Sequence, residues 1–349
     1  SIMTLQSSGQ ISFSQIRDEF GANDGTAVSL GRYRNISSSF SNKDVGSLTD
    51  LPLDTGVPKS GTISASSFYG KRLNIVVDFH SGGTETRVSA SNRYSANNVQ
   101  VVGGYTGRPS SADGKRVIVH VNKTIGSETG GEDRCALRTG GWHPNTYSVE
   151  IEVGPSGKIY GAGGNGGDGG SANGSGGGNG SNGSTALGVE YSCTINNLGR
   201  IQSGYGGGGG GGGRREYRRS GKKSGRWVGS SGGGGGGGAG VQDSPGWWSS
   251  NGGDSPSDAY GGGSNGSDGG NGVDVTSGSG GAGGAEGGAG GNGGAVNNSS
   301  TSGSAGASAG GSGGSGGANG YAIITTQGSL PSISGNAVIG RTQTSGSIT

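Results

Sequence analysis

The chain has 349 residues, of which 90 are glycine and only 27% are hydrophobic. So low an apolar fraction leaves material for a conventional core in the first half alone. The net charge of +2 gives no overall attraction to nucleic acid or to a membrane. No apolar run approaches membrane-spanning length and no signal-like start appears, so we expect a soluble protein that is not exported by the usual route.

The reactive residue types are few and scattered. Cys135 and Cys193 lie outside any C-x-x-C pattern. They permit one long-range disulfide, although buried free thiols are the favoured interpretation. His80, His120 and His143 have no metal-ligand spacing, and no Ser/His/Asp or paired-carboxylate arrangement is visible. We therefore expect no enzyme, no cofactor and no metal site.

Residues 1–70 carry two related segments, at 8–21 and 60–70, each of the form S-G-x-I-S followed by an aromatic residue and glycine. Ser12 is a suitable N-cap for a short helix with Ile16 and Phe20 on its apolar side. Neither segment can bury much surface alone. They predict either docking pieces that fold against a partner or against neighbouring subunits, or a pair of surface turns.

Residues 71–157 are the conventional β region. Apolar alternation at 73–79, 117–121 and 147–153 predicts strands, and glycine- and proline-containing turns separate them. The interpretation is a small antiparallel domain, a sandwich or a barrel-like sheet. A further apolar stretch at 187–201 predicts a strand pair beside the glycine-rich region.

Residues 158–320 are dominated by glycine with a period of three, as at Asn265, Asp268 and Asn271. A three-residue turn belongs to a left-handed extended helix without internal hydrogen bonds. Several such helices can bond to one another where glycine lets the backbones approach. The spacing predicts a polyglycine II helix bundle with distal loops, in a chain otherwise mainly β and irregular. The alternative is a flexible linker. Residues 321–349 are a closing segment.

Two insertions interrupt the glycine runs, a basic one at 214–227 and an aromatic, acidic one at 241–260. Rigid rings and forked guanidinium groups are the side chains that dominate binding interfaces. The candidate receptor-contacting residues are Arg214, Arg215, Tyr217, Arg218, Arg219, Lys222, Lys223, Arg226, Trp227, Pro245, Trp247, Trp248 and Tyr260. Their opposite charges predict that the insertions pair across a common tip. The alternative is a pair of solvated loops with a local aromatic cluster.

The N-terminal segments resemble those of tail-fibre and tail-tip proteins of tailed phages. The glycine blocks with variable insertions resemble the receptor-binding adhesins at the tips of T-even-type long tail fibres. That resemblance implies a polyglycine II sandwich whose loops, here 214–227 and 241–260, contact the host surface. It also implies attachment to other tail proteins through residues 1–70, a homotrimer as one assembly to consider, and a place in the virion after synthesis in the host cytoplasm.

The resulting hypothesis is a receptor-binding protein of a phage tail that recognises an outer-membrane protein or lipopolysaccharide. A structural or ice-binding glycine-helix protein is the first alternative. The second is a glycine-rich nucleic-acid-binding protein, which should show R-G-G repeats and a strong basic excess. Neither is present in this sequence. We therefore expect no nucleic-acid partner.

Overall fold

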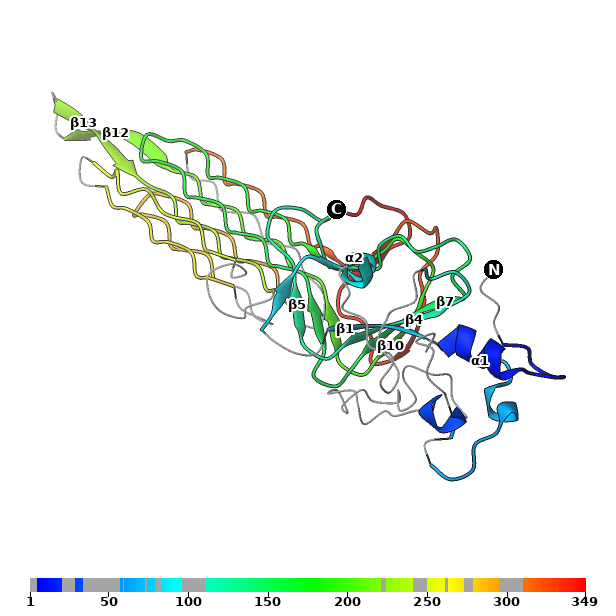
Figure 1. Ribbon diagram of the computed structural model, residues 1–349. Coiled ribbons are helices and arrows are strands. Elements are labelled where there is room, and N and C mark those ends of the chain that lie inside the picture. The colour runs from blue at the N-terminus through cyan, green and yellow to red at the C-terminus, as the bar shows by residue number, and fades with distance from the viewer. Residues whose placement is uncertain are drawn as a thin grey trace.

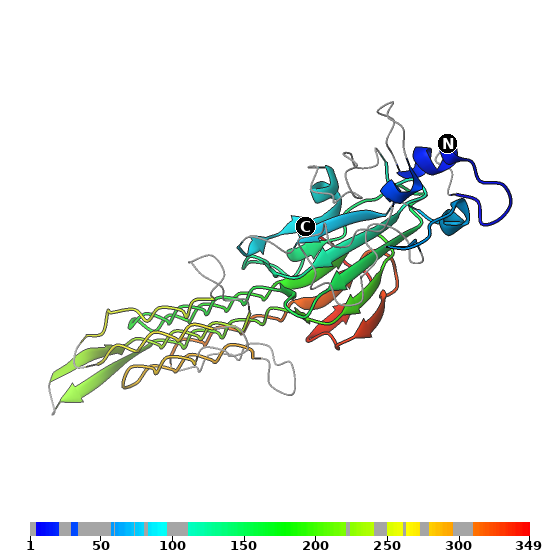
Figure 2. The same cartoon turned by 60° about the horizontal axis from the view of Figure 1, so that its bottom comes forward.

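The computed structural model describes residues 5–20, 29–33, 57–58, 60–72, 74–79, 83–95, 111–220, 224–240, 250–260, 263–272, 279–295 and 310–349. The molecule is elongated (Figures 1 and 2). The N-terminal region lies at one end, a β-body lies in the middle, and glycine-rich segments run to the other end. No helix in the described part of the chain is long and apolar enough to cross a membrane.

The β-body is built from strands that change sheet at every step. Its strands are β1 (Ile75–Phe79), β2 (Glu85–Thr86), β3 (Val88–Ser89), β4 (Arg116–Val121), β5 (Thr124–Gly126), β6 (Cys135–Arg138), β7 (Ser148–Val153), β8 (Lys158–Tyr160), β9 (Thr185–Val189), β10 (Thr194–Asn197), β11 (Arg200–Gln202), β14 (Tyr321–Thr325), β15 (Ser332–Gly335) and β16 (Arg341–Gln343). Helix α2 (Ala90–Ser95) follows β3.

The strands form three sheets with the orders β1-β4-β7-β10-β15, β2-β5-β8-β11 and β3-β6-β9-β14-β16. Each pairing in these sheets is parallel. Successive strands from β1 to β15 therefore enter the first, second and third sheet in turn. Between β15 and β16, an isolated parallel bridge from Ile339 to Gln202 in β11 takes the place of a strand of the second sheet. The chain winds as a three-sided parallel β-helix, in which each turn stacks on the one before.

The predicted antiparallel domain is therefore wrong in its pairing, although β1, β4 and β7 form where the apolar alternation predicts strands. Ile75 pairs with Val117, and Val117 pairs with Val149. These partners are one whole turn of the β-helix apart along the chain. In the described part of the chain, the turns between these strands are corners that redirect the chain to the next sheet. They are not hairpin reversals, and this is why a local reading of turn signals fails here.

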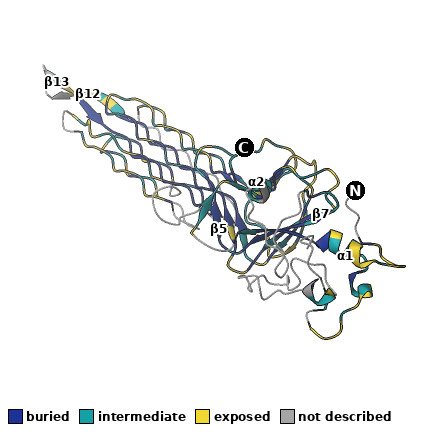
Figure 3. Ribbon diagram, in the orientation of Figure 1, coloured by how far each residue is buried: buried dark blue, intermediate teal, exposed yellow. Residues whose placement is uncertain are grey.

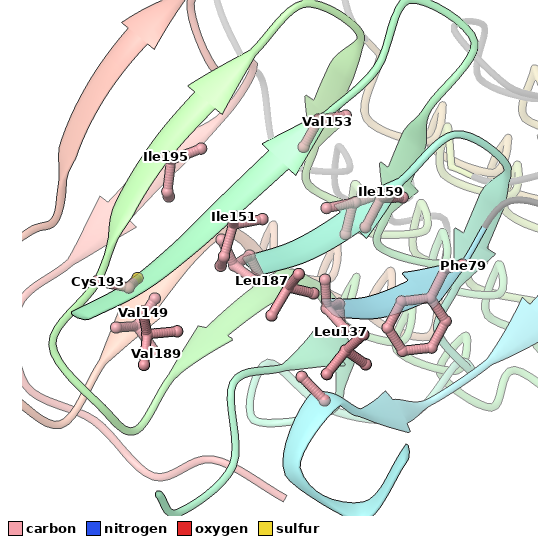
Figure 4. Close-up of a cluster of buried hydrophobic side chains, with 14 of the residues drawn as sticks. Phe79, Leu137, Val149, Ile151, Val153, Ile159, Leu187, Val189, Cys193 and Ile195 are labelled. Carbon is pink, nitrogen blue, oxygen red and sulfur yellow. The ribbon is translucent and has the colours of Figure 1, made fainter. Parts of the chain in front are cut away.

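The core runs along the inside of the β-helix as ladders of like residues (Figure 4). One ladder crosses the first sheet through Val77, Val119, Ile151, Ile195 and Ile333. Another crosses the second sheet through Ile125, Ile159 and Ile201. Because identical or similar side chains stack, each turn of the β-helix covers the apolar side chains of the next turn. The apolar area of the short strands is therefore buried cooperatively.

Both cysteines are buried free thiols. Cys193 lies in the core of the β-helix. Burial raises the pKa of the Cys135 thiol and that of the Cys193 thiol to about 12 in each case. Both side chains are therefore protonated and unreactive at neutral pH.

The two related N-terminal segments pack against each other around a small aromatic cluster. Helix α1 (Phe13–Phe20) has a capping box, in which Ser12 Oγ accepts the Gln15 N–H at 3.2 Å and Gln15 Oε1 accepts the Ser12 N–H at 2.7 Å. Two 3-10 helices at Leu30–Tyr33 and Ala65–Phe68 supply further rings. Phe20 lies 5.6 Å from Phe68 between ring centroids, with Tyr33 against both.

The glycine-rich segments leave the β-helix at a single corner, the one between the second and third sheets. Residues 161–184 connect β8 to β9, and residues 203–320 connect β11 to β14. The corresponding corner between β5 and β6 is only residues 127–134. Strands β14, β15 and β16 complete the β-helix after the glycine-rich excursion, so the β-body is not one continuous stretch of chain.

The excursions run back and forth as extended segments that bond to one another (Figure 1). Apart from the strands β12 and β13 at their far end, the described residues of these segments form neither α-helix nor sheet. One series runs from the N–H groups of Gly204, Gly207, Gly210 and Gly213 to the carbonyls of Ser184, Ser181, Gly178 and Ser175, at 2.8–2.9 Å. Donors and acceptors both step by three residues. A second series from the same segment steps by three to another neighbour, through Tyr205, Gly208 and Gly211.

The position of a segment in the bundle follows from its glycine content. Residues 206–213 and 232–238 are unbroken glycine and are buried throughout (Figure 3). A Cβ added at Gly208 would lie 2.0 Å from the Gly291 carbonyl oxygen, and one at Gly235 would lie 2.1 Å from that of Gly208. These two runs are central segments with close neighbours on several sides. Segments with a larger residue at every third position lie at the surface.

The residues at every third position also bond to the neighbouring backbone. Asn165 Oδ1 accepts the N–H of Asn251 at 3.0 Å, and Asn182 Oδ1 accepts the N–H of Ala318 at 2.8 Å. Similar bonds are made by Asp168, Asn179, Ser267, Asp268, Asn271 and Asn292. The polar side chains therefore accept hydrogen bonds from backbone N–H groups of the adjacent segment. These N–H groups point to the surface of the bundle, where no backbone carbonyl faces them.

We predict that Asn182→Ala lowers the free energy of unfolding by about 1 kcal/mol, because it removes one such bond and leaves a donor partly covered. Ser315→Ala is the matched control, since that exposed hydroxyl lies in the neighbouring row. It should change stability by less than about 0.5 kcal/mol. Chemical denaturation followed by circular dichroism measures both. Equal stability of the two variants would refute a stabilising role for the side-chain ladder.

Candidate functional site

The far end of the glycine bundle carries a two-stranded antiparallel hairpin, formed by β12 (Arg214–Ser220) and β13 (Ser224–Ser230) (Figures 1 and 2). Strand β12 continues directly from the central run 206–213, and β13 leads directly into the central run 232–238. The two glycine runs that lead into and out of the hairpin are therefore held among close-packed neighbours. The strands β12 and β13 project beyond those neighbours.

One face of the hairpin is aromatic. Tyr217 lies opposite Trp227, with 5.2 Å between ring centroids and an edge-to-face angle of 63°. The Arg215 guanidinium carbon lies 4.2 Å from the Trp227 ring centroid, which is cation–π geometry. Tyr217 and Trp227 remain 50% and 48% exposed. Rings that are ordered by neighbours and yet half exposed provide contact area with little entropy left to lose on binding.

Two glycines make room for this face. A Cβ at Gly225 would lie 2.5 Å from the Tyr217 ring, and one at Gly229 would lie 2.4 Å from the ring of Tyr260. Tyr260 comes from a different segment and forms an antiparallel bridge with Gly229. The glycines on either side of Trp227 thus allow Tyr217 and Tyr260 to lie against the strand. We call Arg215, Tyr217, Trp227 and Tyr260 the aromatic face.

The opposite face of the hairpin is charged. Arg214 pairs with Glu216 at 3.0 Å and with Glu286 at 3.1 Å. Arg218 pairs with the same two carboxylates. Glu286 lies in the turn between the segments 279–285 and 286–295. We call Arg214, Glu216, Arg218 and Glu286 the charged cluster.

Two members of the charged cluster, Glu216 and Arg218, have pKa values shifted towards their ionised forms. A hydrogen bond from Arg218 holds the pKa of Glu216 below its usual value, and the charges of Arg218 and Arg214 act in the same direction. The hydrogen bond to Glu216 in turn raises the pKa of Arg218, and Glu286 adds to that effect. The pairing of Glu216 with the arginines is therefore lost only in acid, as the Glu216 carboxylate becomes protonated below its ordinary pKa.

The structure brings most of the candidate residues in the basic insertion together. Arg214, Arg215, Tyr217, Arg218 and Trp227 occupy the hairpin as described above. Arg226 is exposed in β13 opposite Arg218, and Arg219 lies in β12 opposite Gly225. Lys222 and Lys223 lie outside the described residues.

Of the aromatic insertion, the structure describes residues 250–260. Pro245, Trp247 and Trp248 lie outside the described residues. The residues that flank them are at the base of the bundle. A Cβ at Gly240 would lie 2.1 Å from the Gly163 nitrogen, just beyond β8, and Ser250 Oγ donates to the Gly238 carbonyl. The segment 250–260 then runs outward along the bundle. Of the described candidate residues in this insertion, Tyr260 is the one that reaches the hairpin.

The predicted charge pairing between the two insertions is not found among the described residues. Asp258 accepts the N–H of Ala172 at 2.9 Å and does not join the arginines. The acid that reaches the hairpin from another segment is Glu286, which sequence reasoning missed. The available signal was its isolation, since Glu286 is the one charged residue in the glycine-rich stretch 279–295.

The described part of the chain holds no cluster of His, Cys, Asp or Glu side chains that could bind a metal ion. The hairpin presents aromatic rings and guanidinium groups at its surface.

Comparison with known proteins finds no matching family model and no matching curated protein. Among solved structures, the chain is similar to one from the crystal structure of the gp37–gp38 adhesin tip complex of the bacteriophage S16 long tail fiber. The alignment covers 81% of this chain and 87% of that chain, with 18% sequence identity and a TM-score of 0.34.

Proposed function

We propose that the chain is a receptor-binding adhesin of a phage tail, which recognises a bacterial cell surface through the β12–β13 hairpin. The observation that carries the proposal is the aromatic face, with half-exposed Trp227 and Tyr217 at the free end of a long support. The likeness of the N-terminal segments and glycine blocks to phage tail-fibre proteins supports the phage setting. Binding is reversible and non-enzymatic, and needs no cofactor or nucleic acid.

We further propose that the glycine-rich segments are polyglycine II helices. The three-residue step of their hydrogen bonds and the close approach of their backbones support this assignment. At a rise of ~3.1 Å per residue, the segment 203–213 spans roughly 31 Å. The support is stiff because each segment is bonded to several neighbours. Stiffness keeps the ordering cost of binding low.

We assign receptor contact to the hairpin and to Tyr260, which forms a bridge with Gly229 in β13. Pro245, Trp247 and Trp248 lie outside the described residues, and their predicted contact with a receptor stays a prediction.

The opposite end of the molecule suits attachment to the particle. The N-terminal aromatic cluster lies at the end away from the hairpin (Figure 2). Phe13 is 38% exposed beside it, and Tyr147, which carries Arg72 over its ring at 3.7 Å, is 62% exposed. Exposed rings of this kind are typical of protein interfaces. We propose that this end binds other tail proteins.

The test uses the purified chain, labelled with a fluorophore and screened for binding to a panel of Gram-negative strains. On any strain that the wild type binds, Tyr217→Ala with Trp227→Ala should weaken binding by about 100-fold, because two central aromatic anchors are lost. Tyr147→Ala is the matched control, another exposed ring stacked with arginine, and should bind as the wild type does. Unchanged binding of the hairpin variant, with an unchanged melt, would refute the assignment.

A further inference from the structure

Glu286 contacts the hairpin from a separate segment of the bundle. It lies in the turn that joins the outward segment 279–285 to the inward segment 286–295. Its two carboxylate oxygens are divided between two arginines of β12, with Oε2 on Arg214 at 3.1 Å and Oε1 on Arg218. Arg214 and Arg218 are four residues apart on a strand, so their side chains emerge on the same face.

The hairpin needs such a contact because its strands project from the bundle. An isolated two-stranded hairpin is marginally stable in water. On the β13 side, the bridge between Gly229 and Tyr260 ties the strand to a neighbouring segment near its base. On the β12 side, Glu286 makes two ion pairs with the strand. Gly310 and Gly174 lie beside only its first two residues, Arg214 and Arg215, at the base of the hairpin. The hairpin is thus held from two directions, by Tyr260 on one face and by Glu286 on the other.

The two faces also differ in what remains exposed. Glu216 and Glu286 together neutralise Arg214 and Arg218 on the charged face. On the aromatic face Arg215 is stacked on Trp227, and the outer sides of the rings stay accessible. Fixing the charged face against the bundle therefore determines the direction in which Trp227 and Tyr217 point.

We propose that Glu286 is a positioning residue, which orients the aromatic face by holding Arg214 and Arg218 against the distal turn of the bundle. The inference rests on the proposed receptor-binding function of that face. It assigns to Glu286 no contact with the receptor. Without the carboxylate, the hairpin samples other orientations and binding must first select the productive one.

The experiment compares Glu286→Gln, Glu286→Asp and Glu132→Gln. Glu286→Gln keeps the shape and removes the charge, whereas Glu286→Asp keeps the charge. Glu132→Gln is the matched control, because Glu132 pairs with Arg341 at 2.8 Å with 29% side-chain exposure, compared with 30% for Glu286. Cell binding and hydrogen–deuterium exchange of the peptide covering 214–230 are measured for each.

We expect Glu286→Gln to weaken binding about fivefold and to raise exchange in the hairpin peptide, while exchange in the central glycine runs stays unchanged. Glu286→Asp should restore most of the affinity. In a background with Arg214→Gln and Arg218→Gln, the further change Glu286→Gln should have no additional effect. Glu132→Gln should behave as the wild type does.

Wild-type binding and exchange in Glu286→Gln, with binding still lost in Tyr217→Ala/Trp227→Ala, would overturn the positioning role and leave the proposed function standing. A full additional loss of binding in the arginine-free background would also overturn it, since Glu286 would then act on the receptor directly. If Tyr217→Ala/Trp227→Ala bound normally, the proposed function itself would fail.

Discussion

Replacing Gly208 with alanine is expected to lower the free energy of unfolding of the glycine bundle by about 3–6 kcal/mol. Gly208 lies in the central run 206–213, and the new Cβ would lie 2.0 Å from the carbonyl oxygen of Gly291. Ordinary contact needs more than 3 Å, so two segments must move apart by more than 1 Å. Overpacking of this kind costs about 1–3 kcal/mol, and each backbone hydrogen bond that is lost adds about 1 kcal/mol.

The hydrogen bonds at risk are specific. Gly208 donates to Gly236 at 2.7 Å, its carbonyl accepts from Gly167 at 2.8 Å, and the adjacent Gly209 carbonyl accepts from Gly291 at 2.7 Å. The gain from a less flexible unfolded chain, about 0.4–1 kcal/mol, is too small to compensate. The substitution therefore destabilises the folded bundle. In a disordered linker, Gly→Ala would have no such destabilising effect.

Gly178→Ala is the control for Gly208→Ala. The nearest atom to a Cβ at Gly178 is the Asp168 nitrogen at 3.1 Å, which a shift of a few tenths of an ångström relieves. That variant should lose less than about 1 kcal/mol. Thermal melts followed by circular dichroism compare the two. If Gly208→Ala melted together with Gly178→Ala, the close packing of the central segments would be disproved.

Lys115→Ala is expected to cost about 3–5 kcal/mol, because it leaves a buried carboxylate without its lysine. Lys115 Nζ lies 2.5 Å from Glu19 Oε1, and their side chains are only 5% and 2% exposed. Glu19 is in α1, and Lys115 immediately precedes β4. The pair therefore joins the N-terminal cluster to the β-helix. Its loss should release α1 before the β-helix unfolds.

Arg116→Ala is the matched control for Lys115→Ala. Arg116 pairs with Glu150, but the two side chains are 24% and 22% exposed, so water replaces much of the interaction. A loss of at most about 1 kcal/mol is expected. The double variant Lys115→Met/Glu19→Leu should recover most of the stability of the wild type. Limited proteolysis reports release of α1, and resistance of Lys115→Ala equal to that of Arg116→Ala would contradict the expectation.

The strands of the β-helix could be located from the sequence better than they could be paired. Alternation at 117–121 and 147–153 predicts strands, and β4 and β7 form there. Pairing depends on contacts one turn apart, and glycine-rich excursions of 161–184 and 203–320 separate the later turns. The apolar ladder through Ile151 and Ile195 was thus hidden by the insertion between its members.

For the candidate site too, the sequence located the residues better than it predicted their arrangement. The composition of the basic insertion points to a binding surface, because Arg215, Tyr217 and Trp227 occur within one short stretch. Their arrangement on one face requires the hairpin register. The contribution of Glu286 could not be predicted, because it depends on which glycine segments are neighbours. Glycine has no side chain that could distinguish one neighbouring segment from another. The sequence of the glycine runs therefore does not specify which segments lie side by side.

The three-residue step of the hydrogen bonds restricts how the length of this molecule can change. In the polyglycine II geometry that we propose, adding one residue to the segment 203–213 would rotate everything beyond it by about a third of a turn. Every donor past that point would then face the wrong neighbour. A longer or shorter arm therefore requires triplets added or removed in all the adjoining segments together, whereas the hairpin beyond residue 213 can vary in length without disturbing them.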